Sequence, residues 1–185
     1  MKVGFIGLGA MGRPMALHLQ RAGYELFVWA RRPASADGLP ATLCATPAEL
    51  GRQCDVVFTI ITSSADVEAV ALGSNGLIEG MAPDSVLIDC STIAPDAARR
   101  IAARLAEKGI HMLDAPVSGG TQGAIDATLA IMAGGDAAVL ERVRPLLDCL
   151  GQRIVHIGPS GAGQVAKACN QMIMVAAIEA AAEAM

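Results

Sequence analysis

The sequence predicts an α/β protein with a doubly wound, largely parallel β-sheet. Two observations predict it. Short apolar runs rich in β-branched residues alternate with helical segments along most of the 185 residues, which is the order typical of a parallel sheet with helices on both faces. A G-x-G-x-x-G sequence also lies between the first apolar run and the first helical segment, where a tight strand-to-helix turn is expected.

The expected elements follow in chain order. The first helix closes at Gly23, and a later amphipathic helix has Pro95 in its first turn and Gly109 at its end, which are common boundary signals. Ligands of such sheets bind beyond the carboxyl ends of the strands, so the loops there are the expected site. Strands are expected at Lys2–Gly7, Tyr24–Trp29, Asp55–Ile61, Ser85–Asp89, Ile110–Asp114, Thr128–Ala133 and Arg153–His156, and helices at Met11–Ala22, Ser64–Leu72, Ala94–Lys108 and Asp136–Leu150.

The glycine motif indicates a dinucleotide-binding, Rossmann-type fold. Gly7 permits the tight turn, Gly9 lets the backbone approach a pyrophosphate, and Gly12 lets the helix pack closely on the strand. The free amides and the positive end of the helix then hold the phosphates. The alternative is a merely tight turn. We expect the whole motif to bind the cofactor: Gly7, Leu8, Gly9, Ala10, Met11 and Gly12.

The end of the second strand bears on the choice of cofactor. NAD sites usually place Asp or Glu there to bind the ribose hydroxyls, whereas this chain has Arg31 and Arg32 between Ala30 and Pro33. A guanidinium can hold a 2′-phosphate with two hydrogen bonds, and an acid would repel it. The sequence therefore favours NADP, bound first by Arg31 and second by Arg32. NAD is the alternative cofactor, and the alternative role of the arginines is that of solvated loop residues.

Composition argues against several other classes of protein. The net charge is −4 without a basic cluster, which argues against nucleic acid as a partner. The five cysteines form no C-x-x-C pair, which suits reduced thiols in the cytoplasm, and the three histidines are isolated, so no metal site is indicated. The N-terminus lacks the pattern of a signal peptide. The final apolar stretch contains Lys167, Asn170, Glu179 and Glu183, which makes it a poor membrane span.

The segment from Gly161 to Gln171 has the composition of a proton-donating site. A glycine-rich entry precedes Lys167 in an apolar helical run, and Asn170 and Gln171 follow three and four residues later. These positions share one face of a helix, so the three side chains can point into one cleft. A lysine there can exchange a proton with a substrate oxygen while the amides orient the substrate. The alternative is a lysine whose stem packs on the core while its amine reaches solvent.

Three loops after expected strands carry reactive side chains. Ile61 ends one strand and Thr62 begins the loop after it, and we expect both to border the cofactor. The loop after Asp89 contains Thr92, and another loop contains Ser118 followed by two glycines. A hydroxyl beside free backbone amides can form an anion nest for a substrate carboxylate. The alternative for Ser118 is an ordinary helix N-cap.

Taken together, these motifs resemble the β-hydroxyacid dehydrogenase family, which includes 3-hydroxyisobutyrate dehydrogenase, tartronate semialdehyde reductase and glyoxylate/succinic semialdehyde reductases. The resemblance covers essentially the whole chain, with the motifs in order. The similar segments are Gly7–Ala16, Asp114–Gly120, Ile131–Gly135 and Gly161–Gly163 followed by Lys167 and Asn170.

The resemblance implies a role for each matching residue. It implies that Lys167 is the general acid/base and that Thr92 lies near the nicotinamide. It implies that the substrate is oriented by Asn170 or Gln171. In this family an arginine at the position of Arg31 commonly accompanies NADP use. The residues implied to bind the substrate carboxylate are Ser118, Gly119 and Gly120.

Three departures from the family pattern matter. Ala127 stands where many members have glycine, which predicts a slightly shifted turn, and Gln171 stands where some have asparagine. Members continue past the lysine helix into an all-helical domain that completes the active site and builds the dimer, whereas this chain ends at Met185 without a helix stop signal. We therefore expect a fragment: a dinucleotide-binding domain over 1–160, then the start of an interdomain helix over 161–185. Its bare apolar face predicts a homo-oligomer.

The function implied by the resemblance is hydride transfer between NADP(H) and a small hydroxy acid/semialdehyde pair. Lys167 would donate the proton to the forming alkoxide, and burial would lower the pKa of its amine toward neutrality. One alternative is an imine reductase, in which the lysine is usually replaced. Another is a dinucleotide-binding module without catalysis, or an inactive fragment. A phosphogluconate dehydrogenase is disfavoured, because nothing beyond the shared motifs points to a sugar phosphate.

Overall fold

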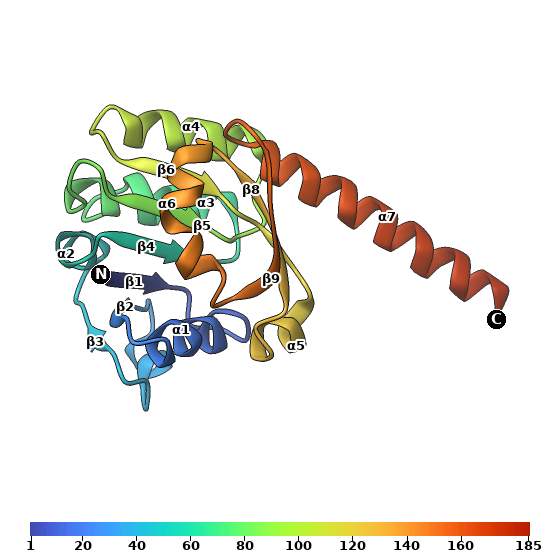
Figure 1. The fold of residues 1–185 in the computed structure, drawn as a ribbon, viewed down its shortest axis with the longest axis horizontal. Helices are drawn as coiled ribbons and strands as arrows, with labels where there is room; N and C mark the ends of the chain where they lie inside the picture. Colours follow the sequence, from blue (N-terminus) through green and yellow to red (C-terminus); the bar gives the residue numbers. More distant parts are fainter.

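The computed structural model describes residues 1–185. Helices cover both faces of one nine-stranded sheet, and a long last helix projects away from it (Figure 1). The strand order is β3-β2-β1-β4-β5-β6-β8, with β7 and β9 both paired to β8. The strands are β1 (Lys2–Ile6), β2 (Glu25–Trp29), β3 (Thr42–Leu43), β4 (Val56–Thr59), β5 (Val86–Asp89), β6 (His111–Asp114), β7 (Val117–Ser118), β8 (Leu129–Gly134) and β9 (Gly151–Gly158).

Every strand and helix expected from the sequence is present, with ends shifted by a few residues. The elements that were not predicted from the sequence are short. They are the strands β3 and β7, the helices α2 (Pro47–Gln53) and α5 (Gly120–Ile125), and two 3₁₀ turns, η1 (Pro33–Ala36) and η2 (Leu77–Glu79). The helices are α1 (Gly12–Arg21), α2 (Pro47–Gln53), α3 (Ser64–Leu72), α4 (Pro95–Ala106), α5 (Gly120–Ile125), α6 (Ala137–Leu147) and α7 (Ala162–Ala184).

The sheet is largely parallel, as predicted. The six strands from β3 to β6 run in one direction, whereas β8 is antiparallel to β6 and to β7. Alternate side chains of each central strand enter two cores. Phe5 of β1 and Phe58 of β4 stack in the core beneath α1, α5 and α6, while Ile6 and Val57 face the core beneath α2, α3 and α4. Two filled faces fix the register of the sheet.

The path of the chain creates a crevice between β1 and β4. From β1 the chain runs outward through β2 to β3, then returns to β4 on the other side of β1. The loops after β1 and β4 therefore leave the sheet in opposite directions, and a ligand can enter between them. The residues after β1 are the glycine motif, and those after β4 are Ile60–Thr62.

Helix α7 packs on the sheet only through its first turns. Its buried residues are Gly163, Gln164 and Lys167, and every residue from Met172 onward is exposed. Figure 1 shows its second half extending into solvent. By its length and its mean hydropathy (1.2), the helix is long and apolar enough to span a membrane. The sequence had predicted that this segment is a poor membrane span. A single such helix is weak evidence for a membrane.

The turn before β8 contains Ala127, the residue that departs from the family pattern. Ala127 has φ = 54°, in the left-handed region that glycine adopts without penalty. The turn nevertheless closes, because the Thr128 amide donates to the Gly123 carbonyl at 2.9 Å. Alanine is thus accommodated at a position suited to glycine.

Candidate functional site

The glycine loop has the geometry that a bound pyrophosphate requires. Gly7 has φ = 103°, and a Cβ on it would collide with the Ile60 carbonyl. A Cβ on Gly12 would collide with the Gly7 carbonyl, so α1 packs directly against the turn. A Cβ on Gly9 would meet nothing within 4 Å, so this backbone faces open space. The three glycines therefore match their expected roles: turn, close approach and packing.

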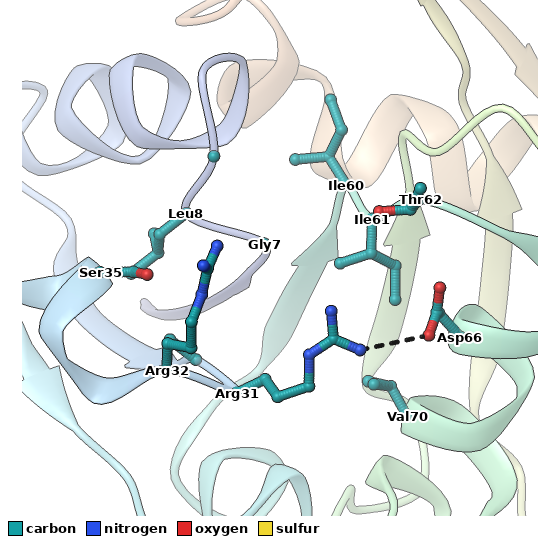
Figure 2. Close-up of a pocket in the computed structure, with 12 residues that line it drawn as sticks. Gly7, Leu8, Arg31, Arg32, Ser35, Ile60, Ile61, Thr62, Asp66 and Val70 are labelled. Carbon is teal, nitrogen blue, oxygen red and sulfur yellow. Dashed lines mark ion pairs between the residues drawn. The ribbon is translucent and has the colours of Figure 1, made fainter.

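A pocket of about 230 Å³ extends from this loop to the end of β2. Figure 2 shows the Arg32 side chain directed toward the glycine loop beside Leu8, and Arg31 reaching across the pocket to Asp66. The Arg31 Nη1 lies 3.7 Å from the Asp66 carboxylate, and the Arg31 side chain is 81% exposed. So long and exposed an ion pair holds the guanidinium weakly. Both predicted arginines therefore line the pocket, together with an acid from α3 that the sequence argument missed.

Arg13 orders the far wall of this pocket. From α1 it donates to the carbonyl of Ser35 at 2.8 Å and to that of Asp37 at 2.7 Å. These bonds fasten the 3₁₀ turn η1, which follows Arg31 and Arg32, to the helix that begins at the glycine motif. Arg13 has no local signature in the sequence, because its partners are backbone atoms more than twenty residues away.

A second pocket, of about 580 Å³, adjoins the first one. Both are lined by Ile60, Ile61 and Thr62, so the two pockets meet at the residues that follow β4, and together they are called the groove. The second pocket brings together predicted residues from five separate segments: Met11, Ile61, Thr62, Thr92, Ser118, Gly119, Gly120, Lys167 and Gln171. Of the predicted residues on α7, Asn170 does not line it; its side-chain amide donates instead to the Gln171 amide oxygen at 3.2 Å.

The Ser118 segment is an open turn rather than a helix cap. Ser118 ends β7, and the N-cap of α5 is Gly119, whose φ is 135°; Gly120 has φ = 63°. No side chain caps α5, so the N-cap alternative for Ser118 is wrong. Two successive glycines with positive φ, beside a hydroxyl in the pocket wall, leave backbone amides free for a small anion.

Lys167 is the buried cation of this pocket. It is 8% exposed, and it forms no ion pair with an acid. Burial lowers the pKa of its amine below the ordinary value, because desolvation disfavours the charged form. A lysine with a lowered pKa can both donate and accept a proton nearer neutral pH.

Two buried carboxyl groups stand at the ends of neighbouring strands behind the pocket. Asp89 of β5 accepts hydrogen bonds from the Thr59 hydroxyl at 2.7 Å and the Ser91 amide at 3.2 Å, while its Oδ2 has no partner. Desolvation raises the pKa of Asp89 to about 6, with a further rise from the charge of Asp114. Desolvation also raises the pKa of Asp114, which accepts from the backbone amides at the start of α7. Neither acid was among the predicted site residues.

Comparison with known sequences assigns the fold to a family. The family described as the NAD binding domain of 6-phosphogluconate dehydrogenase matches residues 2–158. The chain belongs to this family of NAD-binding domains. It is also 47% identical to an NAD-dependent L-serine dehydrogenase of Pseudomonas aeruginosa and 42% identical to a 2-hydroxy-3-oxopropionate reductase of Escherichia coli. Both matches cover all of this NAD-binding domain, but 63% and 64% of the relatives.

A solved structure extends the likeness. The domain superposes on Mycobacterium tuberculosis 3-hydroxyisobutyrate dehydrogenase with L-serine at a TM-score of 0.94 and 37% identity, over 99% of this chain and 63% of that one. The chain thus spans less than two-thirds of the length of these relatives. Their names confirm the predicted resemblance to the β-hydroxyacid dehydrogenases, and the superposition confirms the Rossmann-type fold.

The buried acid at the end of β5 predicts an unusual pH dependence of stability. Folding raises the pKa of Asp89 from 3.8 to about 6, so the folded state binds the proton more tightly than the unfolded state does. Its contribution to stability is fully present below pH 3.8 and is lost as the pH rises through about 6. Two pKa units correspond to about 3 kcal/mol. Asp89→Asn, which mimics the protonated acid, should remove this loss and be the more stable protein at pH 8.

Urea denaturation at pH 4, 6 and 8 measures this difference. The exposed Asp37→Asn is the matched control, and its unfolding free energy should follow that of the wild type at each pH. An Asp89→Asn variant that is no more stable than the wild type at pH 8 would contradict the raised pKa.

Proposed function

We propose that the protein transfers a hydride between NADP(H) and a small hydroxy acid/semialdehyde pair, with Lys167 as the general acid/base. The observation that carries the proposal is the pair of adjoining pockets that form the groove. The first contains the glycine loop with Arg31 and Arg32, and the second contains Lys167 and the Ser118–Gly120 turn. The names of the relatives, which include hydroxyacid and semialdehyde enzymes, support this reaction class.

The residues of the groove fit a dinucleotide. The bare backbone of Gly9 and the amides at the start of α1 suit a pyrophosphate, and Arg31 and Arg32 suit a 2′-phosphate. Ile61 and Thr62 line both pockets, and Thr92 lines the second one. When bound, the nucleotide supplies or accepts the hydride. The protein itself has to bind the substrate, orient it and move one proton.

Lys167 supplies that proton. In the direction of reduction, its ammonium group donates to the oxygen that becomes an alcohol; in the direction of oxidation, its neutral amine accepts the proton from the hydroxyl. Burial lowers the pKa of this amine, because desolvation disfavours its charged form, and so makes the neutral amine easier to reach. Because no carboxylate pairs with the amine, it is free to hydrogen-bond with a substrate oxygen.

The Ser118–Gly120 turn holds the substrate carboxylate. Its hydroxyl and amides lie in the same pocket as Lys167, so a substrate of a few carbon atoms can bridge the two. Gln171 lines the pocket and Asn170 hydrogen-bonds to Gln171, so we assign direct substrate contact to Gln171 and its support to Asn170.

Two alternatives are weaker. An imine reductase is disfavoured by Lys167, and a binding module without catalysis does not explain why the groove ends at a desolvated lysine. The scattered spacing of the five cysteines supports a cytoplasmic location.

Replacing the lysine tests the proposed chemistry. Lys167→Met keeps the length of the side chain but removes the amine, so turnover should fall about 10²- to 10⁴-fold, the usual contribution of general acid–base catalysis. Nucleotide absorbance follows the oxidation of 3-hydroxyisobutyrate and L-serine and the reduction of 2-hydroxy-3-oxopropionate. Lys108→Met, at an exposed position after α4, should leave turnover unchanged. Equal turnover in the Lys167→Met variant would exclude the lysine as acid/base.

Binding of the two nucleotides tests the cofactor preference. We expect the wild type to bind NADPH more tightly than NADH, and Arg31→Ala to weaken NADPH about 10- to 100-fold by removing charge-assisted hydrogen bonds, with little effect on NADH. Arg32→Ala should act in the same direction, and Arg21→Ala, on the exposed end of α1, should have no effect. Nucleotide fluorescence gives the dissociation constants.

A preference for NADH over NADPH would also have a structural basis. If Asp66 rather than Arg31 contacts the adenosine ribose, the wild type will prefer NADH and Asp66→Asn will weaken NADH binding. The relative of Pseudomonas aeruginosa is named NAD-dependent, so this arm of the experiment is informative.

We further propose that the exposed part of α7 pairs with a second copy of the chain. Met172 and Ile173 are each 72% exposed, and Val175 and Ile178 extend the apolar surface without a basic residue. Sedimentation equilibrium should detect dimers or larger species that Val175→Lys with Ile178→Lys disperses. Ala103→Lys with Ala106→Lys, at exposed positions of α4, is the control and should leave the measured mass unchanged. A monomeric wild type would overturn the proposal.

A further inference from the structure

The start of α7 is held by a side chain from a different part of the fold. Its N-cap, Gly161, has φ = 85° and no local side-chain cap. Instead, Asp114 at the end of β6 accepts from the Gly161 amide at 2.6 Å with one carboxylate oxygen and from the Gln164 amide at 3.0 Å with the other. A carboxylate at this position also interacts favourably with the positive end of the helix. The helix is therefore fastened to the sheet at its first turn.

Close packing leaves the first turn of α7 little freedom. A Cβ on Gly163 would lie 2.5 Å from the Asp114 carbonyl and collide with that of Met132. A Cβ on Gly134 would lie 2.6 Å from the Asp114 carboxylate. Only glycine fits at both positions, so the helix backbone rests directly on β6 and β8.

Gln164 then joins α7 to the loop after β5. It is 1% exposed, and its amide nitrogen donates to the Ser91 carbonyl at 2.7 Å while its amide oxygen accepts from the Ile93 amide at 3.1 Å. These two bonds bracket Thr92, which lines the pocket. The Ser91 hydroxyl in turn accepts from the Ile61 amide at 2.9 Å. The side chains of Gln164 and Ser91 thereby tie together three walls of the pocket.

Lys167 lies three residues after Gln164, on the same face of the helix. No ion pair holds Lys167, so its place in the pocket depends on where α7 sits. We propose that Gln164 is a positioning residue that sets the distance between Lys167 and the Ser91–Ile93 loop. The inference rests on the proposed role of Lys167 but concerns a separate side chain that does not line the pocket.

Gln164→Met tests the proposal, because methionine has a similar size and makes neither hydrogen bond. Without the bonds, the Ser91–Ile93 loop separates from the first turn of α7, which Asp114 still holds on the sheet, and water reaches the amine of Lys167. The pKa of Lys167 should then rise toward its ordinary value, since its lowering comes from burial. The pKa is measured on the 185-residue chain, without substrate or nucleotide, by NMR titration of ¹³C-methylated lysines, with Lys167→Met used to assign the signal.

The kinetic readout separates positioning from loss of structure. We expect kcat to fall roughly 10- to 100-fold, as for a small misplacement of a catalytic group, while the dissociation constant of the nucleotide stays unchanged. The exposed Gln152→Met is the matched control and should alter neither quantity. If Gln164→Met does not fold, Gln164→Asn replaces it, because its amide is one methylene too short to reach both partners and the same changes are expected.

A folded variant in which both the pKa of Lys167 and kcat are unchanged overturns the positioning role. Failure of the proposed function is a distinct result. In that case the wild type has no turnover that depends on Lys167, and the NMR titration alone decides whether Gln164 holds the lysine in its desolvated position.

Discussion

The geometry of the site depends on the hydrogen bonds that the Asp114 carboxylate accepts from the start of α7. Burying a charge is costly unless hydrogen bonds replace its lost hydration. Asp114 obtains them from the Gly161 and Gln164 amides at the positive end of α7. The helix in turn obtains an acceptor for amides that would otherwise lack one. This exchange fixes the only part of α7 that contacts the sheet, and Lys167 follows within two turns.

The carboxyl group of Asp89, at the end of the adjacent strand β5, makes two negative charges at this edge of the sheet less favourable than one. Each acid raises the free energy of ionising its neighbour, and the charge of Asp114 is among the causes that raise the pKa of Asp89. Asp114 has two backbone amides and a helix N-terminus, whereas one oxygen of Asp89 has no partner. The negative charge is therefore better solvated on Asp114, whereas Asp89 has the pKa that is raised to about 6 and accepts from Thr59 and Ser91 with one oxygen.

The sequence predicted the features whose cause is local. The glycines of the first turn, the alternation of strands and helices, Arg31 and Arg32, and Lys167 each have a signature within a few neighbouring residues. The two-residue strands β3 and β7 and the short helices α2 and α5 carry too few residues for a periodic pattern. The antiparallel direction of β8 was also out of reach, because strand direction depends on how the intervening 115–128 segment folds back across the sheet.

The parts of the site that escaped prediction depend on contacts between distant residues. Gln164 meets the Ser91 carbonyl across 73 positions, and Asp114 meets the Gly161 amide across 47, so no local pattern reveals either bond. A signal did exist in retrospect: Asp89 and Asp114 each end an apolar strand, and a buried acid there needs donors from elsewhere. The glycines at 134 and 163 are the complementary signal, since a backbone packed against a carboxylate leaves no room for a Cβ. Such acid and glycine pairs therefore mark where a helix is fastened to a sheet, and in this chain Lys167 lies within two turns of that point.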